Sequence, residues 1–244
     1  NIFAKDVAGF LGTNHHEEYM TQQQVLDVAP TIAEKYDEPF SDASQIPTFL
    51  VSQMAKKHVT VCLSGDGGDE LFGGYKRYFS TPAMWSKLRY LPAKNVLAGL
   101  IKSCPTQLLN VLFSPLSPLA AKYGRAGAMG PKLKLLAQWL SAENIMEFYS
   151  QGMRHWKQSP VLTVAEEEVV LWSPSCEGLV SDVEKMMYQD SIAYLPGDIL
   201  TKVDRASMAV SLEGRIPLLD HNIAELAWRM PIEMKLRDSG KWPL

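Results

Sequence analysis

The stretch from Val59 to Tyr78 constrains the fold most, because an apolar run leads straight into a glycine-rich break. The run around Val61 is rich in β-branched residues, which is typical of a strand buried on both faces. The glycines that follow predict a tight turn, since glycine takes such a path without strain. Acidic residues next in line favour the start of a short helix, which Gly73 and Gly74 would end. Strand, loop and helix in this order predict an α/β fold with ligands at the carboxyl end of the strand.

Three carboxylates crowd this loop, at Asp66, Asp69 and Glu70. They would repel a bare phosphate, so glycine amides could hold phosphate oxygens here only with a divalent cation between them and the acids. The loop has no Lys or hydroxyl residue for a Walker motif, and Glu70 stands where the dinucleotide fingerprint needs its third glycine. The residues alone leave two alternatives: a loop for a magnesium nucleotide or pyrophosphate, and a tight acidic turn with solvated carboxylates.

The composition is that of an ordinary globular protein. The 244 residues suffice for one large domain or two small ones, and the hydrophobic share is 46%. A net charge of −3 gives no electrostatic case for nucleic acid or an anionic membrane as the main partner. Three scattered cysteines predict reduced thiols, and no apolar run approaches the roughly 20 residues of a membrane span. We therefore expect a cytoplasmic protein.

Apolar spacing predicts helices along the first 57 residues. One covers Ile2–Leu11, a second runs from a cap at Thr21 to about Tyr36, and a third covers Ile46 to about Lys57 after a cap at Asp42 or Ser44. Thr13–Met20 is expected to form a strand. Adjacent histidines in a strand point to opposite faces, so the pair at 15 and 16 is interpreted as polar edge residues rather than a metal site.

The second half is expected to be mainly helical. Lys132–Trp156 has an amphipathic pattern, and Trp139, Trp156 and Trp172 are expected to pack within a helical portion rather than to stack on bases. A turn at Leu195–Asp198 is expected to precede a helix from Ile199 to about Val210.

On that last helix Lys202 and Arg205 would share one face. The pair could hold a phosphate or a carboxylate, with Asp204 orienting one of them, or it could belong to a solvated face with a local ion pair. Beyond the helix, Glu213, Arg215 and Asp220 are interpreted as a structural ion network.

Several motifs in the same order make the chain resemble a known family. SGDGGDELFGGYKRY, together with LGTNHHEEY, YDEPFSDASQIPT and YLPGDILTKVDRASMAVSLEGRIPLLDH, is similar to the synthetase domain of the glutamine-hydrolysing asparagine synthetases. The resemblance implies an α/β fold like that of the adenine nucleotide α-hydrolases, with an incomplete parallel sheet flanked by helices and a large helical portion. Residues 1–80 would form part of the nucleotide-binding core, and residues 81–244 would complete the domain.

The resemblance also implies a chemistry: ATP with Mg²⁺ converts aspartate to β-aspartyl-AMP, and ammonia from glutamine then gives asparagine, AMP and pyrophosphate. Developing charge on phosphate oxygens would be stabilised by the metal and by a cationic side chain. Asp66 would accept a proton from ammonia, although many members carry Glu there, and Lys241 would assist adenylation. The remaining roles are contact with the nucleotide or the substrate for Ser64, Gly65, Gly67, Lys202 and Arg205, and binding of Mg²⁺ for Asp69 and Glu70.

Two parts of such an enzyme do not occur in these 244 residues. The chain has no S-G-G-x-D-S type loop, and position 1 is Asn rather than the nucleophilic Cys of an amino-terminal glutaminase domain. We therefore expect a piece of a longer protein that is inactive alone and has that glutaminase domain as a partner. Neither nucleic acid nor a membrane is expected as a partner, and a homodimer stays open. The alternatives are a related amide-forming or lactam-forming synthetase with another acceptor, and a non-catalytic binding module.

Overall fold

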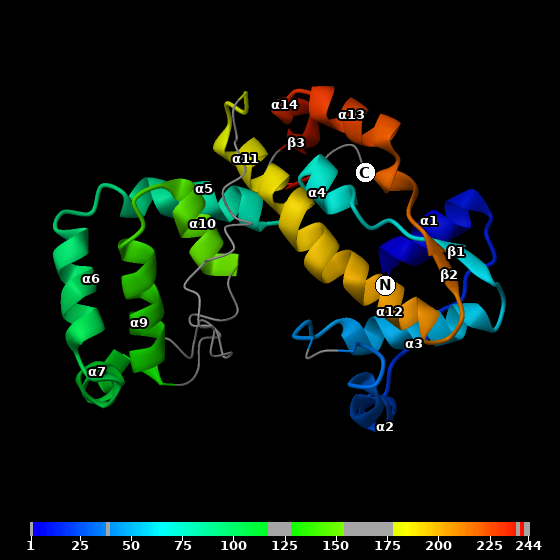
Figure 1. Cartoon of the computed structure of the whole chain (residues 1–244), viewed down its shortest axis with the longest axis horizontal. Coiled ribbons are helices and arrows are strands. Elements are labelled where there is room, and N and C mark those ends of the chain that lie inside the picture. The colour runs from blue at the N-terminus through cyan, green and yellow to red at the C-terminus, as the bar shows by residue number, and fades with distance from the viewer. Residues whose placement is uncertain (1, 38–39, 117–127, 154–177, 238–239, 242–244) are drawn as a thin grey trace. The chain divides into compact units, whose positions relative to one another are not determined.

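The structure is a computed structural model that describes residues 2–37, 40–116, 128–153, 178–237 and 240–241 (Figure 1). The chain divides into two compact units. The first comprises Asn1–Gly67 and Tyr194–Ala224, and the second comprises Gly68–Ala193 and Glu225–Leu244. This division does not test the predicted boundary at residue 80, which stays a prediction.

The first unit is built around a small parallel sheet. Strand β1 (Val61–Leu63) pairs with β2 (Glu213–Arg215), so that Cys62 lies opposite Gly214. The Ser64 amide continues the ladder by donating to the Arg215 carbonyl at 2.9 Å. The helical elements that begin in this unit are α1 (Ile2–Leu11), α2 (Gln22–Ile32), α3 (Gln45–Lys56), α12 (Thr201–Met208), a 3-10 turn (Pro217–Leu219) and α13 (His221–Arg229). The predicted α/β class with a large helical portion is confirmed.

The prediction that the strand at Val61 is buried on both faces is wrong. Val61 is 39% exposed and Leu63 is 74% exposed. The reason is that β1 has β2 as its neighbour on one side, and no second strand pairs with it in the described residues. An apolar run alone cannot reveal how many strands flank it.

The helices predicted for the first 57 residues are confirmed, with small changes at their ends. Thr21 caps α2 through a capping box with Gln24, and α2 ends at Ile32 rather than near Tyr36. The strand predicted at Thr13–Met20 is wrong, because these residues form neither a strand nor a helix. His16 instead stacks on His58, with 4.3 Å between the ring centroids.

A compact apolar cluster joins three helices of the first unit. Ile32 belongs to α2, Phe49 to α3 and Ala206 to α12. Tyr36, which follows α2, is the fourth buried residue of the cluster. Burial of these side chains supplies the main force that holds α12 against α3. The helix that carries Lys202 is therefore fixed beside the amino-terminal half of α3.

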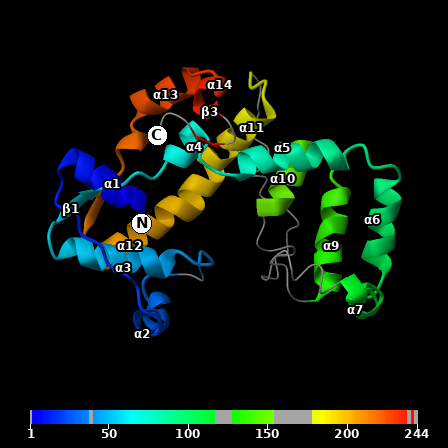
Figure 2. The ribbon, with the colours of Figure 1, turned by 180° about the vertical axis from the view of Figure 1, so that it is seen from behind.

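The second unit is helical apart from a short antiparallel pair, β3 (Leu236–Arg237) and β4 (Gly240–Lys241). Its helical elements are α4 (Gly68–Phe72), α5 (Arg77–Leu88), α6 (Lys94–Ser103), α7 (Thr106–Phe113), a 3-10 turn (Ser114–Leu116), α9 (Met129–Leu140), α10 (Ile145–Met153), α11 (Asp182–Gln189) and α14 (Ile232–Lys235). Figure 1 and Figure 2 both show α6 and α9 side by side.

The helix predicted over Lys132–Trp156 is two helices, α9 and α10, separated by Ser141–Asn144. Trp139 packs edge-on against Phe148, with 5.8 Å between the ring centroids. This contact agrees with the expected helical packing of aromatic residues. Trp156 and Trp172 lie outside the described residues.

A buried charge ties α5 to α10 and to the end of α11. The Asp190 carboxylate is 0% exposed and accepts hydrogen bonds from Arg77, Tyr78 and Tyr149 at 2.6 to 3.1 Å. Burial raises the pKa of both tyrosines, and the nearby Asp190 charge raises it further. The cluster balances one buried anion with one cation and two neutral donors.

The turn predicted at Leu195–Asp198 is also wrong. The chain continues from α11 through a π-helical segment, Asp190–Leu200, directly into α12. Pro196 lies inside this segment. Proline lacks an amide hydrogen and disrupts α-helical bonding, and the wider π turns accommodate it here without ending the helix.

Among the described residues no single helix is long and apolar enough to cross a membrane. The pair α6 and α7 reaches that length and composition only together, and it is bent by 110°.

Candidate functional site

The candidate site is a pocket of about 500 Å³ in the first unit. Its walls come from α3, from β1 with the loop behind it, from α12 and from β2. The residues that line it are Pro47, Thr48, Val51, Ser52, Ala55, Cys62, Leu63, Ser64, Asp66, Lys202, Val203, Ser207, Leu212 and Gly214. It therefore lies at the carboxyl end of β1, where parallel sheets commonly bind ligands.

Two of the predicted residues meet at the first turn of the loop. The Ser64 hydroxyl donates to the Asp66 carboxylate, and the Asp66 amide donates back to the Ser64 oxygen at 3.3 Å. This local pair folds the chain tightly after β1 and keeps both polar groups at the pocket.

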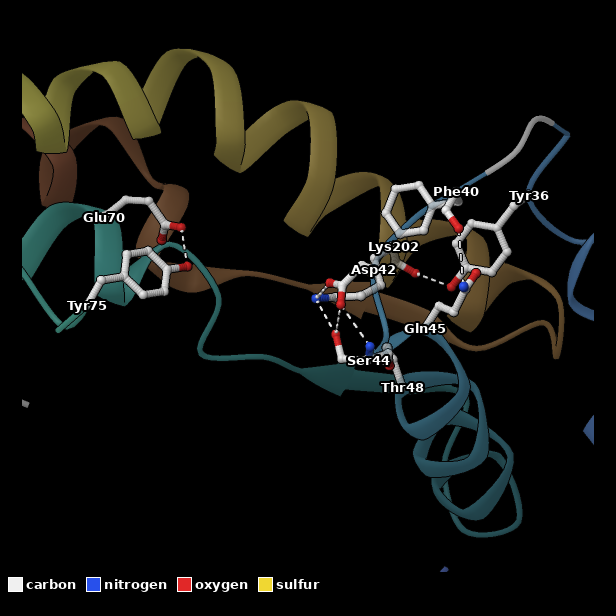
Figure 3. A network of polar contacts seen from close by, with 9 residues as sticks. All are labelled: Tyr36, Phe40, Asp42, Ser44, Gln45, Thr48, Glu70, Tyr75 and Lys202. Atoms are coloured by element: carbon white, nitrogen blue, oxygen red, sulfur yellow. Dashed lines mark hydrogen bonds and ion pairs between the residues drawn. The ribbon is translucent and has the colours of Figure 1, made fainter. Parts of the chain in front are cut away.

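Lys202 supplies the cation of the pocket (Figure 3). Its ammonium group donates to the Asp42 carboxylate at 2.6 Å and to the Ser44 hydroxyl at 2.8 Å. Ser44 in turn donates its amide and its hydroxyl to the other carboxylate oxygen of Asp42. The loop before α3 thus holds the end of the lysine side chain in one place.

Two neighbouring groups reinforce this arrangement. Burial raises the pKa of Asp42, but the hydrogen bonds from Lys202 and Ser44 outweigh it, so this pKa lies below its ordinary value. Tyr36 donates its hydroxyl to the Lys202 carbonyl at 3.3 Å, and burial raises its pKa to about 12. Near neutral pH Lys202 of the pocket therefore lies beside an ionised Asp42 and a neutral Tyr36.

Arg205 takes a different position from Lys202, although both lie on α12. Its guanidinium pairs with Asp37 at 3.1 Å, where both side chains are largely exposed, and it is not among the pocket residues. The two cations of α12 therefore have different partners. Lys202 pairs with Asp42, and Arg205 pairs with Asp37. Asp204 makes no side-chain contact with either cation that the structure describes.

The loop glycines differ in what they require. Gly67 has φ +84°, and a Cβ there would lie 2.9 Å from Leu219 Cδ2, so this position needs glycine. Gly65 has open space around it.

The acidic residues further along belong to the second unit. Glu70 is 1% exposed, and its carboxylate accepts a hydrogen bond from the Tyr75 hydroxyl at 2.7 Å. Burial raises the pKa of Glu70, although this hydrogen bond opposes the rise. The Asp69 side chain lies against Gly74, where only a glycine leaves room for it. The metal roles of Asp69 and Glu70 stay predictions, and the burial of Glu70 argues for a structural part.

Lys241 lies in β4, and its side chain is outside the described residues. Of the expected ion network, Glu213 and Arg215 pair at 2.8 Å, whereas Asp220 accepts from Asn222 at the start of α13. No group of three metal-ligating side chains occurs in the parts of the chain that the structure describes.

Sequence reasoning missed the partners of Lys202. Either Asp42 or Ser44 was expected to cap α3, but the Ser44 side chain makes no capping bond and contacts Lys202 instead. These contacts join positions about 160 residues apart, which no local spacing rule detects. The resemblance of the segment YDEPFSDASQIPT was the available signal.

Comparison with known proteins decides the family. The model of the asparagine synthase family matches residues 1–244. The chain belongs to the asparagine synthase family.

Named relatives of this asparagine synthase chain agree. It is 31% identical over 240 residues to asparagine synthetase [glutamine-hydrolyzing] 1 of Bacillus subtilis, covering 96% of this chain and 35% of the relative. A putative asparagine synthetase [glutamine-hydrolyzing] of Mycobacterium tuberculosis is 30% identical, with 96% and 34% covered. A third, from Methanocaldococcus jannaschii, is 45% identical over 78 residues, which is 32% of this chain and 15% of the relative.

The asparagine synthase chain thus spans about a third of the length of the first two relatives. No solved structure matches it significantly.

Proposed function

We propose that the protein containing this chain uses ATP to adenylate the side-chain carboxylate of aspartate, and that ammonia derived from glutamine then displaces AMP to give asparagine. Family membership supports ATP use and a synthetase reaction. The single observation that carries the proposal is the pocket at the end of β1, which combines a lysine, a carboxylate and a hydroxyl from three of the predicted positions.

The charges of the pocket suit this chemistry. Lys202 offers a cation that could hold a phosphate or a carboxylate of the substrates. Its existing bonds to Asp42 and Ser44 would fix the position of that charge before a ligand arrives, which lowers the cost of organising the site. Asp66 would accept a proton from the attacking amine, with Ser64 as its hydrogen-bond partner.

The residues present fit a magnesium nucleotide. A pocket of about 500 Å³ falls within the range of small-molecule sites. Magnesium in nucleotide sites is commonly held by one or two carboxylates and the phosphates. Asp69 is the residue proposed to hold the ion, whose charge would stabilise the phosphate oxygens. Gly65, Gly67, Arg205 and Lys241 keep their proposed contacts with substrate.

The test uses the full-length protein and measures pyrophosphate release that depends on both ATP and aspartate. Lys202→Met should lower kcat/KM by about a hundredfold or more, because a lost cation next to a phosphoryl group commonly costs several kcal/mol. Arg229→Gln, which removes an exposed arginine of α13, is the control and should leave the rate unchanged. An unaltered rate in the Lys202 variant would contradict the assignment of this pocket.

The choice of acceptor is tested with the same assay. Release of pyrophosphate with other carboxylates but not with aspartate would favour a related amide-forming or lactam-forming synthetase. No ATP turnover with any carboxylate, in a folded full-length protein, would favour a non-catalytic relative. We also propose that the 244-residue chain alone neither hydrolyses glutamine nor forms asparagine, since the S-G-G-x-D-S type loop does not occur in it. Pyrophosphate release by the isolated chain would contradict this.

A further inference from the structure

The charges of this chain are strongly segregated along the sequence. From Leu71 to Ala142 there are ten basic residues and no acidic residue; we call these 72 positions the basic segment. The other 172 residues hold 14 basic and 27 acidic residues. An even spread of acids would place about eight in the basic segment. The whole-chain net charge of −3 therefore combines a segment with a formal charge of +10 and a remainder with a formal charge of −13.

The same segment exposes aliphatic side chains on two helices. In α6, Ala98 and Ile101 pack against α9, whereas Val96, Leu97 and Leu100 face outward. In α7, Leu109 is buried, whereas Leu108, Val111 and Leu112 are exposed. Leu100 is 66% exposed and Val111 is 70% exposed. Each helix thus uses one apolar face for packing in the unit and leaves a second one uncovered by any described residue.

Three lysines beside these faces donate hydrogen bonds to uncharged groups. Lys94 donates to the Ala142 carbonyl, Lys102 to the Ser141 hydroxyl, and Lys134 to the Lys102 carbonyl. These acceptors are uncharged, so the bonds orient the ammonium groups without neutralising them. Lys87 and Arg89 are exposed, and no ion pair within the described residues involves either of them. The surface therefore combines aliphatic groups with net positive charge.

We propose that the outward faces of α6 and α7, with the surrounding lysines and arginines, bind the surface of an anionic lipid bilayer. Helices with an aliphatic face and a lysine-rich border lie in the membrane interface, where the apolar groups reach the acyl boundary and the cations meet lipid phosphates. The α6 and α7 pair is also the part of the described chain whose hydropathy approaches that of a membrane segment, although its 110° bend suits a shallow contact.

Other occupants fit these side chains less well. Hot spots of protein interfaces are rich in Trp, Tyr and Arg and poor in Leu and Val, and lysine is depleted at interfaces. Nucleic acids would leave the exposed leucines of α6 and α7 without a favourable contact, because single strands are bound by stacking on aromatic groups. The aliphatic and lysine-rich composition therefore favours lipid.

The test is co-sedimentation of the full-length protein with large vesicles of phosphatidylcholine alone or of phosphatidylcholine mixed equally with phosphatidylglycerol. We expect binding to the anionic vesicles only, and less binding at about 0.5 M than at about 0.05 M salt, because salt screens the attraction. Lys87→Gln with Arg89→Gln should weaken partitioning by about ten- to thirtyfold, since each cation near the surface contributes about fivefold. Leu97→Gln with Leu100→Gln should weaken it by about tenfold or more.

Matched controls separate lipid binding from other effects. Leu226→Gln changes an equally exposed leucine of α13, and Lys57→Gln changes an exposed lysine, both outside the basic segment, and both should bind as the unchanged chain does. Glutamine is a good helix former, so helical circular dichroism should be kept in every variant. Binding to neutral vesicles alone, or no binding to either kind, would overturn the proposal. The proposal would also be wrong if polyglutamate or duplex DNA bound as tightly as the anionic vesicles and the leucine changes did not weaken that binding. The ligand would then be a polyanion rather than a membrane.

Discussion

At the scale of single residues, Lys202 is the cation that unites the candidate site. Lys202→Met would leave Asp42 without its ionic partner in a place where the two side chains are only 10% and 18% exposed. We expect a loss of about 2 kcal/mol in the free energy of unfolding, because a largely buried charge without its partner is costly. Urea unfolding followed by helical circular dichroism measures it.

The control for this prediction lies one turn further along α12. Arg205→Gln breaks the pair with Asp37, in which the side chains are 47% and 69% exposed. Exposed pairs contribute little, so the loss should stay below about 0.5 kcal/mol. Equal losses in the two variants would show that burial does not set the strength of these contacts.

The depressed pKa of Asp42 predicts an acid-sensitive contribution to stability. The folded-state pKa lies below the ordinary value of 3.8, so the contribution is complete above that pH and is lost as the pH falls through the folded-state pKa. Unfolding free energies measured at several pH values below about 5 should therefore fall less steeply in Asp42→Asn than in the unchanged chain. Parallel pH curves for the two proteins would contradict this origin.

How far the site could be predicted depends on whether a residue acts within its own segment. Ser64 and Asp66 lie where the strand and loop pattern indicated, at the carboxyl end of β1. The different positions of Lys202 and Arg205 could not be predicted, because helical spacing gives them the same face and only the distant loop at 37–44 separates their partners. The burial of Glu70 was likewise hidden, since it depends on packing around α4.

At the scale of elements, the turn after β1 depends on one glycine more than on its neighbour. Gly67→Ala would place a Cβ at φ +84° and close to Leu219, and we expect a loss of about 1 to 2 kcal/mol in unfolding free energy. Gly65→Ala is the matched control. It meets open space and has no positive φ, so it should be neutral or slightly stabilising. The same urea titration decides, and a larger loss at Gly65 would contradict the structure of the loop.

Element boundaries were predictable where a local signal existed and not elsewhere. The start of α2 at Thr21 could be predicted, because its capping box is formed by Thr21 and Gln24, which lie only three positions apart. The continuous helix through Pro196 could not be predicted, because a proline followed by a glycine normally indicates a turn. The π-helical conformation that continues the helix depends on tertiary packing. The strand predicted at Thr13–Met20 fails because no strand in the described part of the chain pairs with these residues.

At the scale of the whole molecule, an uncovered apolar stripe on α1 predicts self-association. Phe3, Val7, Phe10 and Leu11 fall on one face of this helix, and Phe10 is 90% exposed. We expect the 244-residue chain to associate more as its concentration rises, and sulfate to strengthen the effect. Phe3→Gln with Phe10→Gln should reduce it, as measured by sedimentation velocity, whereas Leu26→Gln on α2 should change it little. Association that is independent of α1 would contradict the prediction.

The α/β class was predictable because the segment around Val61 has a strong strand signal followed by a loop and a helix. The extent of the sheet was not. The partner strand β2 consists of Glu213, Gly214 and Arg215, a sequence without strand character that pairs only because α12 delivers it beside β1.

The pairing of β1 with β2 has a consequence for the order in which the protein folds during its synthesis. Its strands are separated by about 150 positions, and Lys202 is about 160 positions from its partners, so the first unit cannot close until the ribosome has released residues beyond 215. Contacts among α6, α7 and α9 span far shorter distances along the chain. We therefore expect α6, α7 and α9 to pack before β2 and α12, the partners of β1 and α3, have been translated.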